Sequence, residues 1–346
     1  MPSFLKKKQF WGSIIAVLLL AYCVKDIRGD DINHLYERVN FYYLIPAILS
    51  QFVMIIGKGV RWGTIIEKHK KLSFLKLIPL FSAGQVLNIV MPALTGQVGR
   101  LLLFARKAEL TKTYVFSTIV IEVLFDAISL VFFIFLLSTA AFAFPAEYRQ
   151  IGFLISIITA AALVLLYLIL HFQDQIGVVG RKLLRGRWPG IYISLRKFSR
   201  SFTRGIELLR STQYFARTLV FSLLAWFAHV LVIYFLFRAF GFELPIFAAV
   251  VLMVINTVAL MVPITPGNAG TFELVIVAPL LAYKVVKSDA VLFALALHII
   301  DLLPIFVLGF MFLHTERMTL KEIKAEGERE ELPDDMDDII VEEKKV

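Results

Sequence analysis

Long runs of apolar residues, separated by short charged connections, make up most of this chain. Eight runs lie at 10–24, 41–60, 77–104, 113–142, 151–172, 217–240, 245–283 and 289–313. A helix needs about 20 apolar residues to cross a bilayer, and most of these runs fit one crossing. The pattern therefore predicts an all-α, polytopic membrane helix bundle. The runs 77–104 and 245–283 are longer, and each is interrupted by proline and glycine.

The two interruptions are similar in sequence. Aligning their prolines also brings two glycines and one carboxamide of each copy into register: Pro92, Gly96, Gln97 and Gly99 with Pro263, Gly267, Asn268 and Gly270. An asparagine, Asn88 or Asn256, lies in the apolar stretch before each copy. Hydrophobic segments broken at corresponding positions of two halves are typical of the binding sites of membrane transporters.

The basic residues predict how the chain is threaded through the membrane, because cytoplasmic connections carry an excess of Lys and Arg. The lysines at 6–8 place the N-terminus in the cytoplasm, and the connections 58–76 and 105–112 are basic too. Run 77–104 is therefore expected to enter and leave on the cytoplasmic side as a re-entrant hairpin, and 245–283 to enter from outside. The opposed hairpins would form an inverted repeat, and their loops would meet near the middle of the membrane and line a cavity.

The long polar connection 173–216 is strongly basic, with nine Lys and Arg against two acidic residues, and is predicted to be cytoplasmic. Apolar residues recur at helical spacing over 191–210. This predicts an amphipathic helix, either in the lipid headgroup layer or packed on the bundle. We expect a transmembrane domain over 1–314, a charged cytoplasmic tail over 315–346, and a multi-pass location in the cell's inner (plasma) membrane.

Composition agrees with a membrane protein and narrows its chemistry. Apolar residues make up 59% of the chain and the mean hydropathy is +0.78. The net charge of +9 falls between apolar runs, so it indicates topology and contact with anionic lipid rather than nucleic acid. The single cysteine, Cys23, allows no internal disulfide, and no metal-ligand or nucleotide-binding motif is present. No cofactor and no metal are expected.

Ionisable residues inside the apolar runs are candidates for function, because a charge is costly to place in a membrane. Glu122 and Asp126 lie one turn apart in run 113–142, and Asp301 lies in the last run. We interpret these three as polar gates or proton sites, and a structural ion pair explains Glu122 and Asp126 equally well. His298 is interpreted as a structural hydrogen-bond partner.

The two loops and the residues beside them form the candidate binding site. Arg100 can offer a planar fork of donors to a phosphate, and Glu273 can pair with a basic residue or take up a proton. Glycine and proline free backbone amides at half-helix N-termini, which suits an anionic group. The predicted substrate-binding residues are Asn88, Gly96, Gln97, Gly99, Arg100, Pro263, Thr265, Gly267, Asn268, Gly270, Thr271 and Glu273.

At these loops the chain resembles the lysylphosphatidylglycerol synthase transmembrane-region family, also called flippase-like membrane proteins. The family's second signature, Pro-x-Thr-Pro-Gly-Gly-x-Gly-Thr-x-Glu, is complete over 263–273 except at Asn268. The resemblance spans most of 10–313. It implies a bacterial or archaeal inner-membrane protein that handles lipids.

Two further family signatures are only partly kept. The first, Pro-x-Arg-x-Gly-Glu-x-x-Arg, keeps its proline, glycine and last arginine but has Leu94 and Gln97 at the other two positions. The third, Glu-Arg-x-x-Asp, has Val123 in place of its arginine. These departures weaken any charge network carried over from the family.

Movement of an anionic lipid or lipid-linked intermediate between leaflets is the function that these features predict. The expected partners are membrane lipids, with a homo-oligomer or an envelope-biogenesis protein as a further possibility. A membrane-embedded lipid-phosphate enzyme and a non-catalytic membrane partner are the alternatives. Lipid aminoacylation is not expected, because too few residues follow the last run for the aminoacyltransferase domain of the bifunctional synthases.

The predicted topology is tested by one cysteine in the basic connection. Arg187→Cys, in a chain whose Cys23 is replaced by Ser, should react with a membrane-impermeant maleimide only after the inner face is opened. Labelling of intact cells from outside would refute the topology and, with it, the opposed hairpins.

Overall fold

Helices form all the regular structure in the residues that the computed structural model describes, which are 8–25, 27–90, 94–139, 211–260, 265–315 and five single positions between 157 and 168. No β-strand occurs among them, so the all-α prediction is confirmed. The helices are α1 (Lys8–Val24), α2 (Gly29–Arg38), η2 (Phe41–Tyr43), α3 (Leu44–Ile66), α4 (Phe74–Val90), α5 (Leu94–Ala108), α6 (Lys112–Thr139), α10 (Thr212–Ala239), α11 (Ile246–Ala259), η5 (Pro266–Asn268), α12 (Thr271–Ala282) and α13 (Lys287–Thr315).

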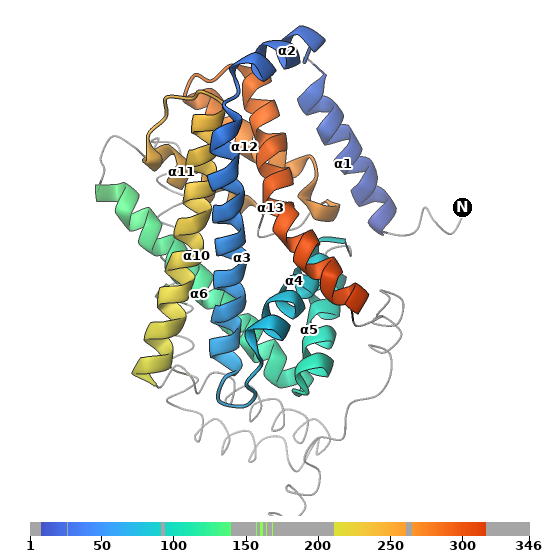
Figure 1. Cartoon of the computed structure of the whole chain (residues 1–346), viewed down its shortest axis with the longest axis vertical. Helices are drawn as coiled ribbons and strands as arrows, with labels where there is room; N and C mark the ends of the chain where they lie inside the picture. The colour runs from blue at the N-terminus through green and yellow to red at the C-terminus, as the bar shows by residue number, and fades with distance from the viewer. Residues whose placement is uncertain are drawn as a thin grey trace, which may run out of the picture.

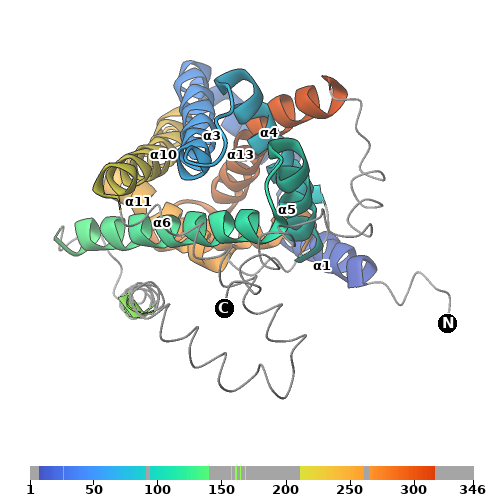
Figure 2. The same ribbon diagram turned by 90° about the horizontal axis from the view of Figure 1, so that it is seen from below.

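Four long apolar helices, α3, α6, α10 and α13, are the frame of the molecule (Figure 1). The shortest, α3, has 23 residues, and at 1.5 Å per residue it is about 35 Å long, enough to cross the hydrocarbon of a bilayer. α3 and α10 lie side by side along their length. Figure 2 shows α6 along one side of the bundle and α3 along another. Large apolar side chains on these helices are exposed, among them Phe135, Phe227 and Phe310, as lipid-facing surfaces require.

Two pairs of shorter helices fill the space between the long ones. α4 and α5 have 17 and 15 residues, and α11 and α12 have 14 and 12. At about 18–26 Å each, none of the four is long enough to cross about 30 Å of hydrocarbon alone. The pairs lie at opposite ends of the molecule, α4–α5 at the lower end and α11–α12 at the upper end in Figure 1.

At the upper end, polar contacts join elements that are far apart in the sequence. Arg38 of α2 forms an ion pair with Asp289 of α13, with 3.0 Å between Nη2 and Oδ2. The backbone N–H of Asn40 donates to the carbonyl oxygen of Ala239, at 2.8 Å. The α11–α12 segment therefore begins and ends at the same end of the molecule.

The lower end is held together in the same way. Arg217 at the start of α10 forms an ion pair with Glu67 after α3, with 2.8 Å between Nη1 and Oε2. Lys70, which precedes α4, pairs with Glu109, which follows α5. The α4–α5 segment therefore also begins and ends at one end of the molecule, the end opposite to that of α11–α12.

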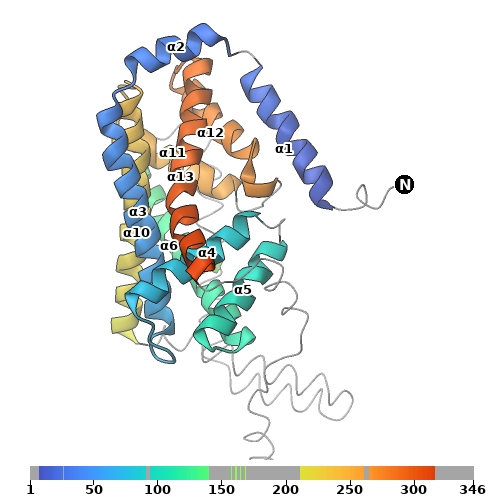
Figure 3. The same ribbon diagram turned by 45° about the vertical axis from the view of Figure 1, so that its right-hand side comes forward.

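Two apolar cores result, one around each pair of short helices. The larger core packs α10, α11, α12 and the first half of α13, with Phe237, Leu252 and Phe293 fully buried. The other packs α4 and α5 on the end of α3, with Trp62 and Phe104 fully buried. α13 contributes to both cores and runs from one to the other (Figure 3).

The apolar runs predicted from the sequence match these helices closely, with one error. The connection 58–76 was expected to be cytoplasmic, which assigned Lys58 and Arg61 to a polar connection. In the structure α3 continues to Ile66, and Arg61 is 0% exposed. The apolar pattern persists through Trp62 and Ile66, which are buried, so the helix does not end at its charges.

α2 is an element that the hydrophobic pattern did not predict. It lies across the upper end between α1 and α3, where only a charge-balanced connection was expected (Figures 1 and 3). The predicted helix 191–210, most of the runs and connections between 140 and 210, and the tail after Thr315 lie outside the described residues. Pro92 and Pro263 lie outside them too.

Gly241 and Gly270 both have positive φ, but only Gly270 is also closely packed. Gly241 has φ +71°, and a Cβ there would meet nothing within 4 Å. Gly270 has φ +82°, and a Cβ there would lie 2.5 Å from the Cβ of Leu19 and 2.9 Å from the carbonyl oxygen of Ala16, both on α1.

Gly270→Ala should therefore destabilise the protein more than Gly241→Ala. Both substitutions carry a left-handed strain of about 1–2 kcal/mol, and only Gly270→Ala adds overpacking of about 1–3 kcal/mol. Thermal unfolding of the two variants in one detergent measures the difference. Equal unfolding temperatures would contradict the close approach of α1 to the second loop.

Candidate functional site

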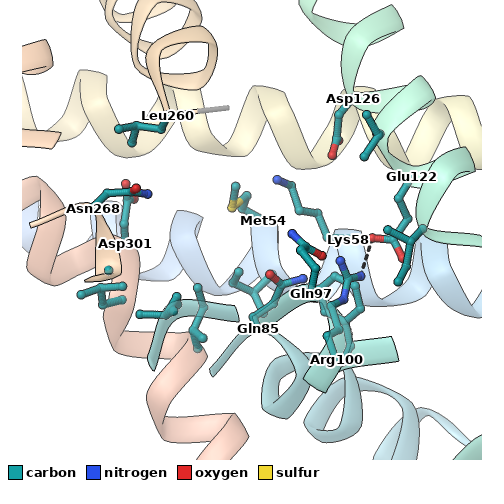
Figure 4. Close-up of a pocket in the computed structure, with 18 of the residues that line it drawn as sticks. Met54, Lys58, Gln85, Gln97, Arg100, Glu122, Asp126, Leu260, Asn268 and Asp301 are labelled. Atoms are coloured by element: carbon teal, nitrogen blue, oxygen red, sulfur yellow. Dashed lines mark hydrogen bonds and ion pairs between the residues drawn. The ribbon is translucent and has the colours of Figure 1, made fainter. Parts of the chain in front are cut away.

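A cavity of about 730 Å³, with charged and polar side chains in a largely apolar wall, lies between the two apolar cores. Figure 4 shows side chains from several helices pointing into it. Its wall combines apolar side chains such as Met54, Ile89, Leu260 and Ile305 with an unusual number of polar ones. The polar members are Gln51, Lys58, Arg61, Gln85, Gln97, Arg100, Glu122, Asp126, His229, Asn256, Asn268, His298 and Asp301.

Arg100 of α5 is paired with Glu122 of α6. Its Nη2 donates to Oε2 of Glu122 at 2.5 Å, and both side chains are about 95% buried (Figure 4). The guanidinium also lies 5.2 and 5.0 Å from the ring centres of Phe81 and Phe104. Nε of Arg100 and Oε1 of Glu122 have no hydrogen-bond partner among the described residues. The pair thus neutralises two buried charges and still leaves polar atoms beside the cavity.

Arg61 of α3 makes the second buried pair, with Asp126 of α6. Both of its terminal nitrogens donate to the carboxylate, Nη1 to Oδ1 at 2.5 Å and Nη2 to Oδ2 at 3.3 Å. Nη1 also donates to Oγ of Ser222, and the indole N–H of Trp226 donates to Oδ1 of Asp126 at 2.8 Å. This network ties α3, α6 and α10 together, and such fork-shaped pairing fixes geometry as well as charge.

Lys58 lies one turn before Arg61 and has a different environment. Its ammonium lies 4.1 Å from the ring centre of Trp226 and lines the cavity. None of the carboxylates that the structure describes lies within ion-pairing distance of it. In Figure 4 this side chain lies between Asp126 above and Arg100 below, with its nitrogen directed toward the middle of the cavity. This side of the cavity, which we call the cationic pole, therefore holds three cationic side chains against the two carboxylates of Glu122 and Asp126.

The other side of the cavity, which we call the acceptor pole, is lined by α10, α11, α13 and the second loop. His229 Nε2 lies 3.3 Å from Oδ1 of Asp301 without hydrogen-bond geometry. The side-chain oxygens of Asn256 and Asn268 and Oδ1 of Asp301 are buried with no hydrogen-bond partner in the described residues. Figure 4 shows Asn268 and Asp301 close together, away from Arg100. This pole offers hydrogen-bond acceptors.

The second loop is shaped by its own hydrogen bonds. Thr265 Oγ1 donates to the carbonyl oxygen of Ala269 at 2.8 Å, and Thr271 Oγ1 donates to that of Asn268 at 2.8 Å. Gly267 and Asn268 both have positive φ, 59° and 58°. Thr265, Thr271 and Gly270 therefore build the turn, whereas Gly267 and Asn268 reach the cavity wall.

Glu273 joins this loop to α13. One carboxyl oxygen accepts the backbone N–H of Gly270 at 2.6 Å, and the other lies 2.7 Å from Nδ1 of His298. His298 Nε2 lies 3.0 Å from the carbonyl oxygen of Gly267, and the imidazole stacks on the ring of Phe272. Glu273 is 2% exposed and is not part of the cavity wall, whereas His298 is.

The first loop approaches its own helix and the second loop. A Cβ on Gly96 would lie 2.8 Å from the Cα of Asn88, so α5 starts in close contact with α4 at that point. A Cβ on Gly267 would lie 3.5 Å from a side-chain carbon of Ile89. The two broken segments therefore meet. Gln97 and Arg100 face the cavity, whereas Gly96, Gly99 and Asn88 are not part of its wall.

The structure thus gathers seven of the residues predicted from sequence around one cavity: Gln97, Arg100, Glu122, Asp126, Gly267, Asn268 and Asp301. Whether they contact a substrate stays a prediction. Sequence reasoning missed Lys58, Arg61 and His229, of which the first two were assigned to a polar connection. Lys58 and Arg61 could have been identified from the apolar pattern on both sides of them, which predicts that the helix continues past the charges.

The comparisons with known proteins define the class. Residues 9–309 match the family described as lysylphosphatidylglycerol synthase TM region, and the chain belongs to this family. It is similar to UPF0104 membrane protein PH1989 of Pyrococcus horikoshii, with 24% identity over 304 residues, 82% of this chain and 90% of that protein. It is also similar to UPF0104 membrane protein MJ1078 of Methanocaldococcus jannaschii, with 26% identity over 247 residues, 69% of this chain and 98% of that protein.

The buried pair predicts an asymmetric response to mutation. Arg100→Met leaves the Glu122 carboxylate buried and unpaired, which should cost about 3–5 kcal/mol. Adding Glu122→Gln removes that charge and should restore most of the lost stability. Arg217→Met, which breaks the partly exposed pair with Glu67, is the matched control and should cost about 0–1 kcal/mol.

Thermal unfolding of the purified variants in detergent makes the comparison. A double variant no more stable than Arg100→Met would show that Glu122 is not the charge that Arg100 neutralises.

Proposed function

We propose that this protein binds an anionic lipid, or the phosphate of a lipid-linked intermediate, in the polar cavity and moves it between leaflets. The observation that carries the proposal is the ammonium of Lys58. It faces the cavity, and within the described part of the chain no carboxylate pairs with it. A cation kept inside an apolar bundle with no carboxylate at ion-pair distance is costly, and an anionic ligand would offset that cost.

The cationic pole suits a phosphate. Its three cations and two carboxylates leave a formal excess of one positive charge. Lys58 can approach a phosphate as a point charge, and the unpartnered Nε of Arg100 and of Arg61 lie in the same wall. We therefore place the phosphate at Lys58, with Arg100 beside it and still paired with Glu122.

The acceptor pole suits the rest of a headgroup. The oxygens of Asn256, Asn268 and Asp301 can accept hydrogen bonds from hydroxyl or ammonium groups. Apolar side chains between the two poles, such as Ile89 and Leu260, suit a ligand that also carries acyl or prenyl carbon. We infer a lipid in which the phosphate bears a polar substituent.

The path across the membrane would use the broken helices. We propose that α4–α5 and α11–α12 are re-entrant hairpins that enter from opposite faces and are related as an inverted repeat. Their short helices, their attachment to opposite ends of the molecule and the contact of Gly267 with Ile89 support this arrangement. Rocking of one hairpin against the other would open the cavity to each leaflet in turn.

We further propose the plasma membrane as the location, with both termini cytoplasmic and the lower end of Figure 1 inside the cell. The lysines at 68, 70 and 71 in the connection before α4 support this orientation. Glu122, Asp126 and Asp301 would then act as gates within the cavity wall rather than as acid and base of an enzyme.

Removal of the Lys58 charge tests the proposal. Lys58→Gln keeps the length of the side chain but loses one charge-assisted contact, which should weaken binding and exchange of labelled phosphatidylglycerol about 10- to 100-fold. The assay uses vesicles with the reconstituted protein and a reductant that quenches only the outer leaflet. Lys71→Gln, on an exposed lysine, is the matched control and should leave exchange unchanged.

Labelled phosphatidylcholine provides the comparison lipid, because its headgroup has no net charge. Exchange of both lipids at one rate, in wild type and in Lys58→Gln alike, would contradict anion recognition. Exchange no faster than in protein-free vesicles would favour a membrane partner that transports nothing.

A further inference from the structure

We infer that Glu273 and His298 hold one proton between them, and that this proton fastens the second loop to α13. The pair is thus a proton-binding site next to the cavity. The shared proton follows from contacts between the loop and α13, whatever the cavity carries.

As a first step, the contact with Gly267 fixes a proton on Nε2 of His298. This nitrogen lies 3.0 Å from the carbonyl oxygen of Gly267. A carbonyl oxygen only accepts hydrogen bonds, so Nε2 must carry a hydrogen. The neutral imidazole has one N–H, so in the neutral form Nδ1 has only a lone pair to offer.

The second step is the short contact on the opposite side of the ring. Nδ1 lies 2.7 Å from Oε1 of Glu273. A neutral Nδ1 facing an ionised carboxylate would place two lone pairs against each other at that distance. A hydrogen must therefore lie between them, either on an imidazolium or on a protonated carboxyl. The ring is not turned over, because that would put carbon atoms against both oxygens and lose both hydrogen bonds.

The third step is the burial of the carboxyl group. Oε2 of Glu273 already accepts the backbone N–H of Gly270 at 2.6 Å, and the side chain is 2% exposed. Without the shared proton, a buried carboxylate would face the lone pair of His298. Repulsion between the carboxylate and this lone pair would push the imidazole away from Glu273, and the Nε2–H that holds Gly267 would move with the ring.

The neighbouring titratable groups do not replace this proton. Cys23 of α1 lies within electrostatic reach of Glu273 and of Lys287 on α13. Asp301 lies one turn beyond His298 on α13 and faces His229 of α10. At the end of α4 the loop meets Ile89, which carries no charge.

The bound proton has a consequence for the cavity wall. Gly267 and Asn268 belong to the wall and to the loop that the pair holds closed. Because closing takes up a proton, the closed loop is favoured at low pH and is lost as the pH rises. Because closing takes up one proton, the ratio of open to closed loop should change by up to about tenfold per pH unit.

The experiment measures loop opening and proton content in the full chain in lipid nanodiscs. Ala269→Cys, with Cys23→Ser, reports opening by its maleimide labelling rate, corrected with a free thiol peptide at each pH. Glu273→Gln mimics the protonated carboxyl and should remove the pH dependence by keeping the loop closed. Glu243→Gln, on an exposed glutamate between α10 and α11, is the matched control and should keep the slope.

Proton content is read directly by nitrogen NMR of histidine-labelled protein, with His298→Gln for assignment, and by the infrared band of a protonated carboxyl, with Glu273→Gln for assignment. We expect either both nitrogens of His298 protonated or a protonated Glu273. A neutral His298 beside an ionised Glu273 in the closed loop would overturn the inference. A labelling rate with the same pH dependence in wild type and Glu273→Gln would overturn it too.

Discussion

The fold depends on charged side chains that are buried in an apolar bundle and must find partners there. Arg61 and Arg100 are almost fully buried, and each is neutralised by a carboxylate of α6. Because an unpaired charge in such surroundings costs several kcal/mol, these pairs fix how α3 and α5 lie against α6. Ser222 and Trp226 extend the same network to α10. The cavity lies where these polar groups meet, between the two apolar cores.

The broken helices follow from the same constraint. Backbone groups freed by proline and glycine survive inside a membrane protein only where protein buries them or a polar cavity solvates them. The second loop meets this need with hydrogen bonds from Thr265 and Thr271 and with the Glu273 carboxyl on the N–H of Gly270. α1 then packs against Gly270 so closely that no side chain fits there. The contacts that shape the loop are therefore also the contacts that satisfy its freed backbone groups.

Sequence reasoning predicted the helical class, the apolar runs and the two matching breaks, because hydropathy and turn residues are local signals. It singled out Arg100 and Glu122 in separate roles, because a charge inside an apolar run is costly, and the structure pairs the two. It misplaced Arg61, whose partner Asp126 lies 65 positions away, because pairing over that distance has no local signature. It treated Lys58 in the same way. A charge near the end of an apolar run suggests that the helix ends there. Here the apolar pattern continues beyond the charges, through Trp62 to Ile66, and shows that the helix continues too.

The most direct test of the account is an experimental structure of the protein in nanodiscs made with an anionic phospholipid. The account predicts a headgroup inside the cavity, with its phosphate within hydrogen-bond distance of the Lys58 ammonium and with Arg100 still paired with Glu122. A cavity without a headgroup, in which Lys58 has turned to pair with Asp126 or Glu122, would contradict it.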